Sequence, residues 1–346
     1  MAYISFQPTD NFKTHLFTGT GASNAQTFPQ TTAMQPDIVW IKNRDAADFQ
    51  VFANSISGAT KYVEVNDSLV QTTNAESVKS FDSDGFTVGT QNEVNTDTEE
   101  YVSWNWKMGT TSGIGGSPSI TPTAYSLNAT AGQSIIQYTG TGVAGTLPHG
   151  LGATPEMIIV RNLAGGYNWI VYHEAMDSAG RLSKLNIDGA WSLVTTIWNN
   201  TLPTATLFSV GTNSETNQSA DTLLAYCFTS IKGYSKFGKY IGSGSTDGTF
   251  VYTGFRPSCV LIKGYEDAVD WIMFDSKRRD FNPQNEGMRP NSTAAELTDD
   301  YIDLLSNGFK WRSSSTMGNG SGYNYMYAAF AESPQVSSND IPGVAR

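Results

Sequence analysis

Four patterns of apolar and polar positions recur three times along the chain, always in the same order. The first is an aromatic residue that leads into a glycine turn, and the second is a proline followed by consecutive apolar residues that end at a basic one. The third is a short aromatic strand, and the fourth is a turn with its strand and a later closing strand. The proline-led runs are Pro36–Lys42, Pro155–Arg161 and Pro257–Lys263.

The spacing of these patterns indicates that one unit has been repeated. The offsets from the proline to the aromatic strand, counted at Phe49, Trp169 and Trp271, are 13, 14 and 14 residues. The offsets are 50, 53 and 52 to the phenylalanine of the fourth pattern, and 70, 73 and 73 to the last aromatic residue of the closing strand. The sequence therefore predicts three copies of one all-β unit, each of roughly 75–95 residues.

The local chemistry suggests how one unit is built. A strand that is apolar on consecutive residues is covered on both faces, and the basic residue at its end is expected to let it reach water. Asp84-Gly85 and Asn307-Gly308 are expected to supply the positive φ of tight hairpins. Short strands with such turns predict a β-sandwich or a partly open barrel. One helical turn is expected at residues 292–297, where a serine or threonine cap precedes a glutamate.

Composition divides the chain into six parts. We expect an N-terminal arm (1–14), repeat one (15–109), a Gly/Ser/Thr/Pro-rich linker (110–134), repeat two (135–230), repeat three (231–334) and a polar C-terminal tail (335–346). The linker is expected to hinge repeat one away from the other two. The short link between Phe228 and Tyr240 predicts contact between repeats two and three.

Charge and cysteine content narrow the classes of function. The net charge is −11, from 21 basic and 32 acidic residues, which argues against a nucleic-acid partner and against an anionic membrane surface. The two cysteines, Cys227 and Cys259, lie in apolar runs and are expected to be buried free thiols. No signal peptide and no apolar run of membrane-spanning length is visible, so we expect no membrane insertion and synthesis in a cytoplasm.

Two motifs resemble ligand sites but are better explained as turns. Residues 140–145 match GxGxxG, yet Leu147-Pro148 follows where a nucleotide site needs a helix. Residues 82–85 resemble the start of a calcium loop with Glu93 at its twelfth position, yet repeat three has Asn307-Gly308 there without an acidic pair. We therefore expect no cofactor and no metal.

The remaining candidate residues do not form a recognisable active site. His15, His149 and His173 lack zinc-binding spacing, and no GxSxG elbow occurs. A triad or a carboxylate pair that meets only in space stays open, although we expect no enzyme, and hence no catalytic residues. Three aromatic residues outside the strand cores could stack on sugar rings or could pack at turns and interfaces: Trp191, Tyr323 and Tyr325.

Longer phrases in repeats two and three carry a family resemblance. They are Pro148–Arg161, Asn168–His173, Tyr234–Gly238, Gly248–Pro257, Leu304–Phe309 and Tyr327–Glu332. Together they resemble a tandem β-repeat family of tailed, often marine, bacteriophages, found in tail-fibre-like and virion structural proteins. The resemblance covers roughly residues 125–334 well and residues 1–109 more loosely, and it implies no catalytic residue.

The resemblance implies a non-enzymatic virion structural protein, assembled in the host cytoplasm. We expect a tail fibre or tail-associated protein that takes part in host attachment. Its expected partners are other virion proteins, further copies of itself in a homo-oligomer (a trimer), and a host surface glycan or protein. A capsid decoration or cement protein is the alternative, and a hydrolase of envelope polysaccharide is a third. The N-terminal arm is the expected docking segment.

Overall fold

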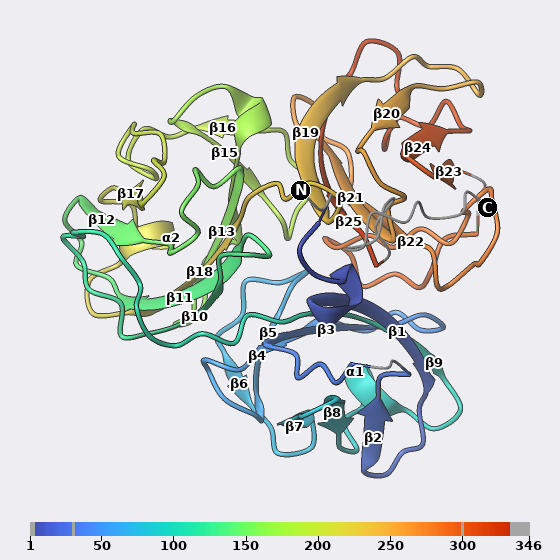
Figure 1. The fold of residues 1–346 in the computed structure, drawn as a ribbon, viewed down its shortest axis with the longest axis horizontal. Helices are drawn as coiled ribbons and strands as arrows, with labels where there is room; N and C mark the ends of the chain where they lie inside the picture. The colour runs from blue at the N-terminus through green and yellow to red at the C-terminus, as the bar shows by residue number, and fades with distance from the viewer. Residues whose placement is uncertain (1–3, 30–31, 299–300, 333–346) are drawn as a thin grey trace.

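Three β-rich units lie around a common centre (Figure 1). The structure is a computed structural model that describes residues 4–29, 32–298 and 301–332. Repeat one is blue to cyan, repeat two green to yellow and repeat three orange to red, and the described N-terminal segment reaches the centre between them (Figure 1). Almost all regular structure is antiparallel β-strand, as the sequence predicts.

Each unit is a sandwich of a larger and a smaller antiparallel sheet. In repeat one the larger sheet has the order β1-β9-β3-β4-β5-β6 and the smaller sheet β2-β8-β7. Their bounds are β1 Phe12–Thr18, β2 Asn24–Thr27, β3 Ile38–Asn43, β4 Val51–Asn54, β5 Lys61–Glu64, β6 Thr72–Thr73, β7 Val78–Asp82, β8 Gly85–Val88 and β9 Glu100–Trp106. A 3₁₀ turn, η1 (Pro8–Asp10), precedes them, and a short helix, α1 (Asn92–Asn95), precedes β9.

Repeats two and three reproduce this order. The larger sheets run β10-β11-β18-β13-β14-β15-β16 and β19-β25-β21-β22, and the smaller sheets are β12-β17 and β20-β24-β23. In repeat two the elements are β10 Ala124–Asn128, β11 Gln133–Thr139, β12 Gly145–Pro148, β13 Met157–Asn162, β14 Ile170–His173, η2 Glu174–Met176, β15 Arg181–Lys184, β16 Ser192–Leu193, β17 Leu207–Val210, α2 Ser214–Asn217 and β18 Thr222–Phe228. In repeat three they are β19 Ser235–Ile241, β20 Phe250–Tyr252, β21 Cys259–Gly264, β22 Ile272–Asp275, β23 Ile302–Leu305, β24 Gly308–Trp311 and β25 Asn324–Phe330. The matching strand orders confirm the repeat.

The proline-led strands β3, β13 and β21 are buried on both faces, as the sequence predicts. One face of each larger sheet packs on the smaller sheet of the same unit and forms a separate core. The opposite face packs into one cluster that all three repeats share, which we call the central core. Since only three units together bury these faces, the units form a closed ring rather than a string.

Aromatic rings meet across every junction of the central core. Phe52 of repeat one contacts Tyr226 of repeat two, with ring centroids 5.1 Å apart. Phe228 of repeat two and Trp106 of repeat one both contact Phe330 of repeat three, at 5.9 and 5.6 Å. Each such pair stabilises the fold by about 0.5–1.5 kcal/mol in addition to the contribution of the apolar area that it buries. All three junctions are stabilised in this way, through the faces of the larger sheets that form the central core.

Two sets of polar contacts repeat around the ring. In the first, a side chain just before β4, β14 or β22 donates to a carbonyl of the preceding repeat: Trp169 Nε1 to Glu64 (2.9 Å), Trp271 Nε1 to Lys184 (2.8 Å) and Gln50 Nε2 to Arg289 (2.8 Å). In the second, the last residue of the same strand meets the closing strand of the next repeat. These pairs are Asn54 with the Tyr226 hydroxyl (3.3 Å), His173 with the Tyr327 carbonyl (3.1 Å) and Asp275 with Trp104 Nε1 (3.2 Å).

The junction between repeats three and one contains a charge network. Glu296 accepts from Arg44 Nε at 2.9 Å and from Arg278 Nη1 at 3.0 Å. Arg278 is fully buried and also donates to Asp275 at 2.7 Å, and its guanidinium lies over the Trp104 ring. These groups join the first and last repeats, which no short connection holds together.

The hinge predicted at residues 110–134 is wrong. Strand β10 lies within this segment and pairs with β11, so it extends the larger sheet of repeat two. Ile120 is buried in the core of repeat two, and a β-bridge joins Thr110 to Leu127. The composition indicated flexibility, but the apolar residues spaced along the segment give it a face to bury.

The N-terminal arm also has a structural role. Strand β1 begins at Phe12, three residues before the predicted boundary. Ile4 is buried in the central core, and the Phe6 ring meets the Tyr234 ring edge-on at 5.3 Å. The predicted tail, residues 335–346, lies outside the described residues.

Three local predictions were wrong for physical reasons. Gly85 and Gly308 have no positive φ; each sits where a Cβ would lie about 2 Å from a carbonyl oxygen of the neighbouring strand (1.8 and 2.1 Å). Lys42, Arg161 and Lys263 lie one residue before the ends of their strands but are buried, because their side chains donate to loop carbonyls. Residues 292–297 form no helix, since their backbone joins repeat one: the Ser292 carbonyl accepts from Gln50 and Glu296 N donates to the Arg44 carbonyl.

The third sequence pattern was also matched one residue out of register. Gln50, not Phe49, is equivalent to Trp169 and Trp271, at an offset of 14 in every repeat. The backbone N–H of each donates to an equivalent asparagine, at Asn66, Asn186 and Asn291. This position requires a side-chain N–H donor that reaches the neighbouring repeat, and glutamine and tryptophan both supply one.

We expect Glu296→Gln to open the junction between repeats three and one. The change removes one of the two carboxylates that balance the charge of the buried Arg278, so the free energy of unfolding should fall by about 3 kcal/mol. Urea denaturation measures it. Asp247→Asn is the control, since Asp247 pairs with Lys310 on the exposed surface and its loss should leave the midpoint unchanged. Equal midpoints for both variants would contradict this role.

The central core also holds an apolar cavity of about 40 Å³, which residues of all three repeats line. Ala328 lines it, at the position that Trp104 and Tyr226 occupy in the other repeats. Ala328→Val should raise the free energy of unfolding by about 0.5–1 kcal/mol, because it fills empty space. Ala329→Val, on the opposite face of β25 in the packed core of repeat three, should lower it by about 1–3 kcal/mol. Thermal unfolding of both variants distinguishes these outcomes.

Candidate functional site

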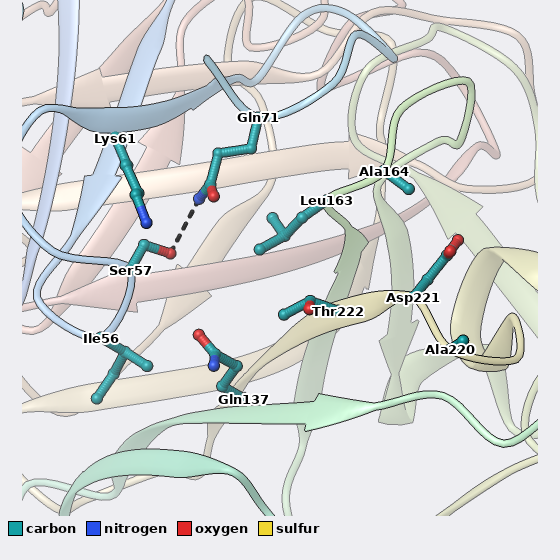
Figure 2. Close-up of a pocket in the computed structure, with 10 residues that line it drawn as sticks. All are labelled: Ile56, Ser57, Lys61, Gln71, Gln137, Leu163, Ala164, Ala220, Asp221 and Thr222. Atoms are coloured by element: carbon teal, nitrogen blue, oxygen red, sulfur yellow. Dashed lines mark hydrogen bonds between the residues drawn. The ribbon is translucent and has the colours of Figure 1, made fainter. Parts of the chain in front are cut away.

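An open pocket of about 500 Å³ lies between repeats one and two. Figure 2 shows Ser57, Lys61 and Gln71 of repeat one facing Gln137, Asp221 and Thr222 of repeat two. The loop of repeat one is fixed there because Gln71 N donates to the Leu163 carbonyl at 3.0 Å. Ser57 Oγ accepts from Gln71 Nε2 at 3.0 Å (Figure 2).

The chemistry of this pocket is that of hydrogen bonding. Its lining residues include one ammonium, on Lys61, and one carboxylate, on Asp221, which accepts from Asn162 Nδ2 at 2.8 Å. Glycoside cleavage uses two carboxyl groups across one bond, and this lining contains a single one. No aromatic ring lines the pocket for stacking on a sugar. The pocket can hold a small polar ligand, but it does not assemble a reacting group and a base.

The three histidines are separated and serve the fold. His149 and His173 each accept a backbone N–H at Nδ1, from Leu151 and Ala175, and each pairs Nε2 with a carbonyl oxygen. These contacts fix the tautomer with a proton on Nε2. Burial lowers the pKa of both to about 4, so both are neutral near pH 7. His15 packs among Phe17 and Phe28, and burial lowers its pKa as well.

The other candidate groups are also accounted for by packing. Cys227 and Cys259 are buried free thiols, as the sequence predicts, and burial raises the pKa of each. Residues 82–85 form the turn of the β7–β8 hairpin, and residues 140–145 lead into strand β12 rather than a helix. Across residues 4–29, 32–298 and 301–332, no three His, Cys, Asp or Glu side chains come together as a metal site. No helix in those ranges is long and apolar enough to cross a membrane.

The aromatic residues singled out from the sequence lie in packed positions. Tyr325 is buried, and its hydroxyl donates to the Thr316 carbonyl at 2.6 Å; Tyr323 stacks on its ring. Trp191 lies at the junction of repeats two and three, under the Arg181 guanidinium at 4.1 Å. Among the residues that the structure describes, the exposed aromatic ones are Phe250, Tyr252 and Phe281, which sequence reasoning did not single out. Alternation along residues 250–252 was the available signal, since it places Phe250 and Tyr252 on one side of the strand.

The neutral histidines predict a loss of stability in acid. Between about pH 6.5, the ordinary histidine pKa, and pH 4 the unfolded chain binds protons that the folded chain does not. The free energy of unfolding should therefore fall as pH decreases, by up to about 3 kcal/mol per buried histidine. His173→Asn copies the equivalent residue of repeat one, Asn54, and should reduce this pH dependence. Urea midpoints from pH 7.5 to 4.5 measure it; an unchanged slope in the variant would refute the assignment.

Comparison with known proteins identifies a family but no activity. The chain matches the family described as a domain of unknown function (DUF7483) over residues 7–334. No curated protein matches the chain. The matched range spans all three units of the ring. The chain belongs to the DUF7483 family of domains of unknown function.

Proposed function

We propose that the protein is a non-enzymatic structural protein of a bacteriophage virion, a tail fibre or tail-associated protein that takes part in host attachment. The closed ring of three sandwiches is the observation that carries the proposal. Two of its three histidines and both of its thiols are buried in packing roles, and the pocket between repeats one and two offers hydrogen bonding without a catalytic pair. The resemblance to tailed-phage repeat proteins, good over roughly residues 125–334 and looser over residues 1–109, supports the assignment to a virion. A rigid β scaffold that carries loops on its surface is suited to presenting a binding surface.

A capsid decoration or cement protein is the second candidate, and the ring favours it in one respect. The chain repeats nearly the same sandwich three times around one axis. A single copy could therefore match a threefold partner, such as a threefold position on a capsid or the end of a fibre trimer.

The homotrimer remains a prediction, and the ring restricts which surfaces could form the interface between its chains. The apolar faces of the larger sheets already meet one another within one chain. A trimer would have to form through the outer surfaces of the units. The proposed docking role of the N-terminal arm cannot be tested by deletion, because Ile4 and Phe6 pack within the ring and their loss should destabilise it.

Immunogold electron microscopy of purified virions tests the proposal. The proposal expects label on the tail or its fibres, and label on the capsid surface would establish the second candidate. Absence from the particle would overturn both. The purified ring should also reduce phage adsorption to host cells if it binds the host, whereas the protein unfolded by heat should not. Release of oligosaccharides from host polysaccharide would instead reveal a hydrolase.

A further inference from the structure

One backbone contact marks an equivalent groove at each of the three junctions of the ring. In each case a residue of one repeat donates its N–H to the residue that directly follows the proline-led strand of the next repeat. These contacts are Gln71 N to the Leu163 carbonyl (3.0 Å), Trp191 N to the Tyr265 carbonyl (2.7 Å) and Glu296 N to the Arg44 carbonyl (3.0 Å). The three grooves can therefore be compared residue by residue.

Side chains that pair with one another occupy two of these grooves. Between repeats two and three, the Trp191 ring lies under the Arg181 guanidinium at 4.1 Å. In the same groove Asp177, from the loop between β14 and β15, pairs with Lys239 at 2.5 Å. Between repeats three and one, Glu296 and its arginine partners occupy the equivalent place.

The groove between repeats one and two is open, and it forms the pocket of about 500 Å³. The strand registers place Lys61 where Arg181 lies, and Gln137 where Lys239 lies. Gln71 lies where repeat two has its tryptophan. The same backbone contact forms at the other junctions while their grooves are occupied, so the fold does not require an open groove. Small-molecule sites have volumes of about 300–1,000 Å³, and this pocket falls within that range.

The pocket opens on the surface of the molecule. All of its lining residues belong to the described part of the chain, and four of them are exposed: Lys61, Ala164, Ala220 and Thr222. The last described residue, Glu332, lies at a different junction, where its carboxylate accepts from Thr14 N at 2.9 Å. The described chain therefore leaves repeat three at the junction with repeat one, and not at this pocket.

The carboxylate in the lining has a role in the fold. Asp221 accepts from Asn162 Nδ2 at 2.8 Å, as Glu99 accepts from Asn43 at the equivalent place in repeat one. Figure 2 shows the Asp221 side chain directed away from Lys61. Asp221 therefore does not supply the counter-charge of the lysine.

The Lys61 ammonium is the charged group that the pocket leaves unused. Within the residues that the structure describes, it forms no hydrogen bond and no ion pair. Figure 2 shows Lys61 and Gln71 pointing into the pocket from one side and Gln137 from the other. Ser57 accepts from Gln71 Nε2 at 3.0 Å, and its own O–H remains able to donate.

These groups indicate the class of ligand. A single ammonium balances the one negative charge of a carboxylate, whereas a phosphate monoester carries a charge of about −2. Side-chain amides and hydroxyls both donate and accept, so Gln71, Gln137 and Ser57 suit the hydroxyl groups of a sugar. Leu163 and Ile56 supply apolar surface for the C–H groups of such a ligand.

We propose that the pocket between repeats one and two binds a uronic acid residue of a saccharide, with Lys61 pairing with its carboxylate and Gln71, Gln137 and Ser57 bonding to its hydroxyl groups. The inference rests on the proposed role in host attachment and names the ligand class for it. The same chemistry would also be met by a free sugar acid, and the choice of probes distinguishes these two sources.

The test measures binding to the full chain by saturation-transfer-difference NMR titration. The probes are glucuronate, glucose, glucose 6-phosphate and a hyaluronan tetrasaccharide, which contains glucuronate residues. We expect glucuronate to bind about fivefold more tightly than glucose or glucose 6-phosphate, and this preference should weaken as salt rises, because salt screens the ion pair. The tetrasaccharide should bind at least as tightly as glucuronate.

Variants then locate the site. Lys61→Gln should lower the affinity for glucuronate to that for glucose, about fivefold, and should leave the urea midpoint unchanged because Lys61 has no partner in the described fold. The double variant Lys61→Arg with Gln71→Trp keeps the charge but copies the pair that occupies the groove between repeats two and three, so it should abolish binding. Lys79→Gln removes a lysine of the same repeat outside the pocket and should leave affinity within about twofold.

The outcomes separate this inference from the proposed function. Equal affinity for glucuronate and glucose, or a preference that Lys61→Gln leaves intact, would overturn the carboxylate site. Tighter binding of glucose 6-phosphate would replace the carboxylate with a phosphate. Binding of glucuronate without the tetrasaccharide would assign the pocket to a free sugar acid and remove its link to host attachment.

The location of the protein on the particle is an independent result. A protein that immunogold places on the tail but that binds none of the probes would overturn the site and leave the virion role standing. Absence from the virion, with binding of glucuronate that depends on Lys61, would overturn the proposed function and leave the site standing.

Discussion

The fold depends on the two apolar faces of each larger sheet. One face is covered by the smaller sheet of its own unit, and the other has no cover within that unit. If this second face were exposed, it would present a row of aromatic and aliphatic side chains to water. The free-energy cost would be roughly 25 cal/mol for each Å² of apolar surface. Three units closed around one axis bury all three faces at once. This constraint explains why the N-terminal arm, the segment after β9 and the loops between strands are drawn into the junctions.

The apolar faces bring the units together, and the polar contacts determine how they are placed. The residue that ends β4, β14 or β22 is an asparagine, a histidine and an aspartate, and each meets a different group on the next closing strand. A buried polar group without a partner costs about 1–3 kcal/mol, so exchanging two units would leave mismatched pairs. The charge network of Glu296 and Arg278 lies at the junction between the ends of the chain, where neighbouring sequence cannot hold the units in register.

Repetition also helps to separate structural residues from candidate functional ones. Asn95, Asn217 and Asn319 are equivalent and buried. Each accepts a backbone N–H of the glycine turn at Oδ1 and donates from Nδ2 to the carbonyl six residues before it, so their role is structural. Phe250 and Tyr252 are the opposite case, since they are exposed and have no aromatic counterpart in the other units. In the pocket between repeats one and two, Ser57 accepts from Gln71 and Asp221 accepts from Asn162, so these polar groups already have partners within the fold.

The sequence by itself determined the repeat, the all-β class and the two-sided burial of the proline-led strands, because periodicity, turns and apolar runs are local properties. The sequence also contained a repeated asparagine, at Asn95, Asn217 and Asn319, with offsets of 59, 62 and 62 residues from the proline. The more conspicuous aromatic patterns drew attention away from it. Only the tertiary structure decided that the units close into a ring, that residues 124–128 form a strand, and that Lys42 and Lys263 are buried. It also decided which aromatic residues face water. Each of these depends on what a distant part of the chain places against the residue, and that information is absent from the residue's own neighbours in sequence.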